Sequence, residues 1–82
     1  MMNTYSTLLL CYIQLQDKIQ TAYEQKNASK DLIDILRLLY RAVCEASNEY
    51  KNHALFSDLE NKVEEDLESL KKYSPDVFKN RY

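Results

Sequence analysis

The sequence contains no glycine, and this absence argues against several kinds of protein at once. Tight β-hairpin turns need residues with positive φ, which glycine adopts most easily, so a strand-rich fold is disfavoured. The two common phosphate-binding loops of nucleotide-binding proteins are built on glycine, so neither is present. The chain also lacks tryptophan and has one proline. Its 82 residues suffice for one domain, and we expect a single all-α domain over residues 1–82.

Cysteine is scarce as well. Two cysteines are far too few for a disulfide scaffold. If the first two helices form a hairpin, Cys11 and Cys44 lie at about the same height, so a disulfide or shared metal ligation is conceivable. The simpler interpretation is two small buried side chains. There is no basic leader, and no apolar run approaches the roughly 18–20 residues of a membrane span, so we expect a cytoplasmic protein without a membrane span.

Apolar residues recur at spacings of three and four, which is typical of amphipathic helices. The first helix is expected from Thr4 to Lys26. The second is expected to begin after Ser29, which serves as its N-cap, and to run to about Tyr50. The apolar residues of this second helix cover roughly 200° of its circumference, so it needs more than one neighbour or faces a second copy of the chain.

The third helix is predicted from a capping-box pattern, with Ser57 as the cap and Glu60 three residues later, and runs to about Tyr73. Its apolar arc is only about 120° wide, so we expect an outer helix packed against one groove. Residues 74–76, Ser-Pro-Asp, predict the start of a short fourth helix. Because short connections favour antiparallel neighbours, the predicted fold is an antiparallel three-helix bundle with a short fourth C-terminal helix.

The acidity of the third helix is the most unusual feature. The chain has a net charge of −2, yet residues 57–70 alone contain six acids and one base. Three of the acids recur every fourth residue, where like charges slightly destabilise a helix. Such a face would attract a protein partner with a basic surface, whereas the simpler interpretation is a solvated helix face. The predicted partner-binding residues are Glu60, Glu64, Glu65, Asp66 and Glu68.

Asp66 differs from the other acids because its helical position lies beside apolar residues. A buried carboxylate needs a hydrogen-bonding or charged partner. Arg37, Arg41 or a tyrosine hydroxyl could supply it. The simpler interpretation is a salt bridge at the rim of the core, and the alternative is a specificity contact in an interface.

No catalytic or metal site is predicted. Glu45, Glu49 and His53 would share one ridge of a continued helix, but di-iron bundles need Glu-x-x-His motifs on two helices, and this chain has one histidine. No nucleophile–base pair can be assembled around His53. The nearly balanced charge gives no reason to expect nucleic acid as a partner. We therefore expect no metal, no cofactor and no enzymatic activity.

These observations predict a small non-catalytic protein-binding module. It would act on a protein target as an inhibitor, immunity factor, antitoxin or adaptor, and would use the acidic face of the third helix. The alternative is a structural homodimer assembled through the wide apolar arc of the second helix.

Overall fold

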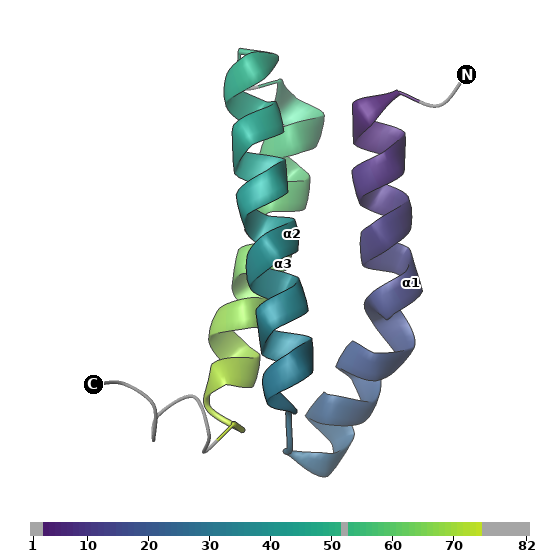
Figure 1. Ribbon diagram of the computed structural model, residues 1–82, viewed down its shortest axis with the longest axis vertical. Helices are drawn as coiled ribbons and strands as arrows, with labels where there is room; N and C mark the ends of the chain where they lie inside the picture. The colour runs from purple at the N-terminus through teal and green to yellow at the C-terminus, as the bar shows by residue number, and fades with distance from the viewer. Residues whose placement is uncertain (1–2, 52, 75–82) are drawn as a thin grey trace.

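The computed structural model describes residues 3–51 and 53–74, and within those ranges the chain forms three helices and no strand. They are α1 (Thr4–Gln25), α2 (Lys30–Glu49) and α3 (Ala54–Lys71), which run down, up and down in Figure 1, so consecutive helices are antiparallel. The prediction of an all-α, three-helix bundle is therefore confirmed for this part of the chain. The predicted fourth helix lies in residues 75–82, outside the described residues.

The first two helices begin at side-chain caps. The Asn3 side chain accepts a hydrogen bond from the Ser6 N–H at 2.8 Å, which fixes the start of α1. The predicted cap of α2 is confirmed, because Ser29 Oγ accepts a hydrogen bond from the Leu32 N–H at 3.1 Å. Each cap satisfies a backbone donor that has no partner inside its helix.

Both connections use lysine in the left-handed conformation, where glycine would be the ordinary choice. Lys26 ends α1 with φ of 51°, and Lys51 follows α2 with φ of 59°. After Lys26, the Asn27 N–H donates to the Ala22 carbonyl at 3.1 Å, which is the closing hydrogen bond of a Schellman motif. A chain without glycine thus still makes two tight helical turns, at a local conformational cost of roughly 1–2 kcal/mol for each left-handed residue.

The predicted start of the third helix is wrong. Helix α3 begins at Ala54, three residues before Ser57, and its N-cap is His53, whose Nδ1 accepts a hydrogen bond from the Leu55 N–H at 3.2 Å. Ser57 lies inside the helix, where its N–H donates to the His53 carbonyl at 3.1 Å. The capping-box pattern therefore marks no boundary here.

The packing of Phe56 explains the earlier start. Phe56 is buried, its ring stacks on Tyr50 at a centroid distance of 5.2 Å, and its edge contacts Tyr5 at 5.6 Å. Because helical spacing places Phe56 on the same face as Leu59 and Val63, extending the helix back to Ala54 directs its ring into the bundle. Burial of this aromatic side chain outweighs the weaker local preference for a cap at Ser57.

The core lies along the axis between the three helices. Side chains of α2 and α3 supply its most completely buried members, and α1 closes it from one side. The α1–α2 connection is anchored to the far end of α3, because the buried Ala28 donates its N–H to the Tyr73 carbonyl at 3.2 Å. The largest fully buried apolar side chains are Ile33, Leu36, Val43, Val63 and Leu70.

Helix α3 packs closely against α2. It also contacts α1, through the ring of Phe56 and the carboxylate of Asp66. Its narrow apolar arc suffices for two neighbours because polar side chains on its edge make part of the contact with α1.

Candidate protein-binding surface

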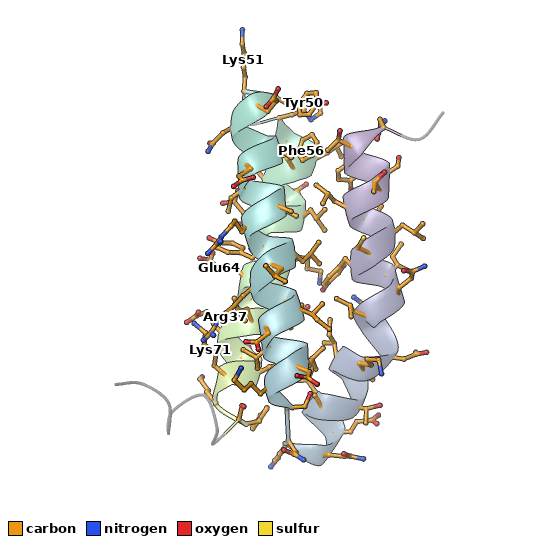
Figure 2. The ribbon with its side chains drawn as sticks, in the orientation of Figure 1. Arg37, Tyr50, Lys51, Phe56, Glu64 and Lys71 are labelled. Carbon is orange, nitrogen blue, oxygen red and sulfur yellow. The ribbon has the colours of Figure 1, made fainter. Side chains whose placement is uncertain are left out.

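The acidic row of α3, defined as Glu60, Glu64 and Glu68, follows the edge of the helix that faces α2. Glu64 and Glu68 are exposed and Glu60 is half-buried. Figure 2 shows Arg37, Glu64 and Lys71 on the side of the α2–α3 pair that points away from α1. The row is therefore open to solvent, with Arg37 and Lys71 on the same side of the molecule.

All three members of the acidic row interact with another side chain, and the partner of Glu60 is Cys44. Glu64 accepts a hydrogen bond from the Tyr40 hydroxyl of α2 at 3.2 Å. Glu68 pairs with Lys71, one turn along α3, with 3.0 Å between Nζ and Oε2. Because both contacts lie at the surface, each contributes little to stability, and both carboxylates keep an oxygen accessible to another molecule.

Cys44 lies beside the acidic row. Burial raises the pKa of its thiol, the Tyr40 hydroxyl opposes that shift, and the negative charge of Glu60 adds to it. The Cys44 thiol in turn, together with burial and Glu64, raises the pKa of the Tyr40 hydroxyl to about 12. Both groups are therefore mainly protonated at neutral pH.

Asp66 faces away from the acidic row and toward α1. Its Oδ2 accepts a hydrogen bond from the buried Tyr12 hydroxyl, and its Oδ1 accepts one from the Tyr23 hydroxyl at 2.9 Å. Of the partners considered from the sequence, a tyrosine hydroxyl is the one present, and Arg37 and Arg41 are not. Burial first, and then the hydrogen bond to Asp66, raise the pKa of Tyr12 to about 12. Asp66 therefore holds α1 to α3.

Glu65 and Asp58 lie on the outward side of α3, and both are exposed. The five predicted partner-binding residues thus occupy three sides of the helix. Glu60, Glu64 and Glu68 share one edge, Glu65 points outward, and Asp66 lies at the contact with α1. Only the acidic row gives several carboxylates a common direction.

The structure does not place Glu45, Glu49 and His53 on one continuous helix ridge. His53 caps α3 instead of continuing the ridge of Glu45 and Glu49 on α2. Among residues 3–51 and 53–74, no group of three or more His, Cys, Asp or Glu side chains converges on a position for a metal ion.

The two cysteines are free thiols. Cys11 is exposed on α1, and Cys44 is half-buried on the side of α2 that faces α3. The expectation of two small buried side chains is therefore wrong for Cys11. Equal height in a helical hairpin does not bring two residues together when one of them points toward the third helix.

An aromatic cluster lies at one end of the bundle. Tyr50 and Phe56 stack there (Figure 2), and the Tyr50 hydroxyl lies 3.2 Å from Thr4 Oγ1. A largely apolar hollow of about 270 Å³ opens beside them, with Tyr5 and Leu55 in its lining. The cluster joins the start of α1 to the α2–α3 connection.

A second feature is an apolar strip on the outside of α2, where Leu38 extends the wide apolar arc predicted for this helix. Leu38 is 65% exposed and Ile35 is 44% exposed, with the half-buried Ala42 next to them on the same helix face. We call these three residues the outer face of α2. The signal was available in the sequence, since positions 35, 38 and 42 follow helical spacing, but Leu38 falls among charged residues.

No protein-family model, no curated protein and no solved structure matches this chain. Among the described residues, none of the helices has the combination of length and apolar character needed to cross a membrane.

Proposed function

We propose that this chain is a small, non-catalytic, cytoplasmic protein-binding module of the inhibitor, immunity, antitoxin or adaptor type. In this proposal, the acidic row of α3 docks on a basic surface of a protein partner. The observation that carries the proposal is the arrangement of Glu60, Glu64 and Glu68. They point in one direction, and only Glu68 forms an ion pair with another described residue.

Two properties of the acidic row support a binding role. Its like charges destabilise α3 by a few tenths of a kcal/mol for each neighbouring pair, so the row does not help the fold. The hydrogen bond from Tyr40 orients the Glu64 side chain before any partner arrives. An oriented side chain loses less conformational entropy on binding than a freely rotating one, which favours affinity.

The charge also predicts how binding responds to salt. An acidic surface accelerates association with a basic partner, and this acceleration falls as ionic strength rises. We therefore expect salt to lower the association rate much more than it changes the dissociation rate.

The test is a charge-reversal variant in which Glu60, Glu64 and Glu68 are all replaced by lysine. Wild-type protein is used as bait in a lysate of the cells that express it, and captured proteins are identified by mass spectrometry. The binding rates of the purified partner are then measured by surface plasmon resonance. We expect the association rate to fall by roughly tenfold or more at low salt.

A matched control separates this surface from the total charge of the chain. Replacing Asp17, Glu24 and Glu49 by lysine changes the net charge by the same amount at exposed positions on α1 and α2. Both triple variants are first checked for helix content by circular dichroism. The proposal requires that the control keep wild-type rates, and equal rates for all three proteins would contradict it.

A further inference from the structure

The outer face of α2 is an apolar strip that no described residue covers. Leu38 and Ile35 project from the middle of the helix, and Leu38 is the most exposed of the large apolar side chains that the structure describes. Next to Ala42, the surface deepens into a hollow of about 390 Å³ between α1 and α2, lined by Leu8 and Ala46 on its apolar side and by Glu45 and Glu49 on its polar side. Contiguous exposed apolar surface of this kind is typical of an interface.

The charges beside this face follow a self-complementary order. Lys30, Asp34, Arg41 and Glu45 lie along one edge of it with alternating sign and with spacings of four, seven and four residues, and Arg37 lies on the same edge near its middle. Read in the opposite direction, these four charges keep the same spacings with every sign reversed, and Arg37 is the one charge of the edge that does not follow this order. A helix with this pattern is electrostatically complementary to an antiparallel copy of itself.

We infer that the outer face of α2 docks against the outer face of α2 in a second copy of this chain, antiparallel and related by a two-fold axis beside Leu38. In this arrangement the two Leu38 side chains meet near the axis. Ile35 lies over the second copy's Ala42, and the same contact recurs on the other side of the axis. A two-fold interface requires such reciprocal contacts.

The sizes of these apolar side chains fit this arrangement. Ala42 is small and borders the 390 Å³ hollow, so the larger Ile35 of the second copy has room above it. Pairing a large with a small side chain lets facing layers interdigitate without an overlap.

The charged side chains fit it too. Asp34 lies opposite the second copy's Arg41, and Lys30 opposite the second copy's Glu45. Arg41 and Glu45 are exposed and form no ion pair with any residue that the structure describes, so both are free to pair across the interface. Lys30 and Asp34 pair with each other within α2 at 2.9 Å, and in the dimer each would share its charge with the second copy. Asp31 comes near the second copy's Glu45, and the adjacent Lys30 offsets that repulsion.

The first test is sedimentation velocity at protein concentrations from about 1 µM to about 1 mM. This range covers weak and moderate protein association. We expect a monomer–dimer equilibrium in the wild type. Leu38→Glu should raise the dimer dissociation constant by about 100-fold or more, because each dimer loses two buried leucines. The position is exposed in the single chain, so the variant keeps its fold. Leu10→Glu, at a position 42% exposed on the outward side of α1, is the matched control and should leave the constant unchanged.

The second test addresses the orientation. Asp34→Arg and Arg41→Asp should each weaken the dimer, and the double variant should recover most of the affinity, because the exchanged charges face each other again. Recovery supports the antiparallel pairing. A wild type that stays monomeric over the whole range, a Leu38→Glu variant that dimerises normally, or a double variant weaker than both singles overturns the inference. The Glu60, Glu64 and Glu68 reversal lies on another helix and should not alter dimerisation, so this inference and the proposed function can fail separately.

Discussion

Removing the carboxylate of Asp66 is the most informative perturbation of the fold. This side chain accepts hydrogen bonds from two tyrosines of α1, and Tyr12 is only 8% exposed. Replacing Asp66 by alanine leaves both hydroxyls without that acceptor. A hydrogen bond to a charged group contributes about 1.5–3 kcal/mol, and an unpaired buried hydroxyl costs a similar amount.

The expected loss is smaller than the sum of two such bonds. Asp66 and Tyr23 are half-buried, so in the variant water can accept the hydrogen bond that the Tyr23 hydroxyl donated to the carboxylate. We therefore expect Asp66→Ala to lower the free energy of unfolding by about 2 kcal/mol, most of it through Tyr12. For a domain of this size, that corresponds to a fall in Tm of roughly 8–16 °C.

Urea unfolding followed by circular dichroism at 222 nm measures this change. Asp58→Ala is the matched control, because Asp58 is the same residue type, lies on the same helix and is exposed. The Asp58→Ala substitution gains as much helix propensity as Asp66→Ala, but it removes no hydrogen bond to a tyrosine. A double-mutant cycle with Tyr12→Phe should give a coupling energy of about 1 kcal/mol. Equal stability of the two Asp variants, or strict additivity in the cycle, would refute the reasoning.

Three further predictions concern stability. The raised pKa of Tyr12, about 12 against 10.0 for an unperturbed tyrosine, means that its stabilising contribution is complete below pH 10 and is lost as pH rises toward 12. The difference in unfolding free energy between wild type and Tyr12→Phe should therefore shrink in urea titrations over that interval, and a difference that grows would contradict the assignment. Lys26→Gly should stabilise the protein by about 0.5–1 kcal/mol, because Lys26 has a positive φ and glycine relieves that strain, and a lower urea midpoint would oppose this. Leu36→Ala, at a fully buried position of α2, should cost about 2–5 kcal/mol, whereas a loss below 1 kcal/mol would show that the core has collapsed around it.

The helices that could be predicted well are those whose limits are set locally. Ser29 is a cap in the sequence and in the structure, and the apolar periodicity of the first two helices places their ends within a residue or two. The apolar residues of each of these helices repeat along one face over its whole length. One residue that departs from this pattern therefore does not change the predicted helix. At Ser57 the local signal competed with a non-local one, the burial of Phe56 against Tyr5 and Tyr50, and the non-local contact prevailed.

The candidate surface was predictable in composition but not in direction. The spacing of Glu60, Glu64 and Glu68 already placed them on one edge of a helix, and Asp66 on another. Which edge faces α1 and which faces α2 depends on the hand with which α3 turns past the first two helices. Helical spacing is the same for either hand of the bundle. From the sequence, the partner of Asp66 could therefore be either a tyrosine or an arginine.

The two proposed surfaces lie on different sides of helix α2, so both can exist on so short a chain. Its edge toward α3 carries Tyr40, which orients Glu64 of the acidic row. Its outer face, centred on Leu38, lies on a different side of the same helix. A dimer formed through that outer face would leave the acidic rows of both copies uncovered and related by the two-fold axis. Two identical binding surfaces on one particle favour a partner that presents its basic patches in pairs, because the second contact then forms at a high effective concentration.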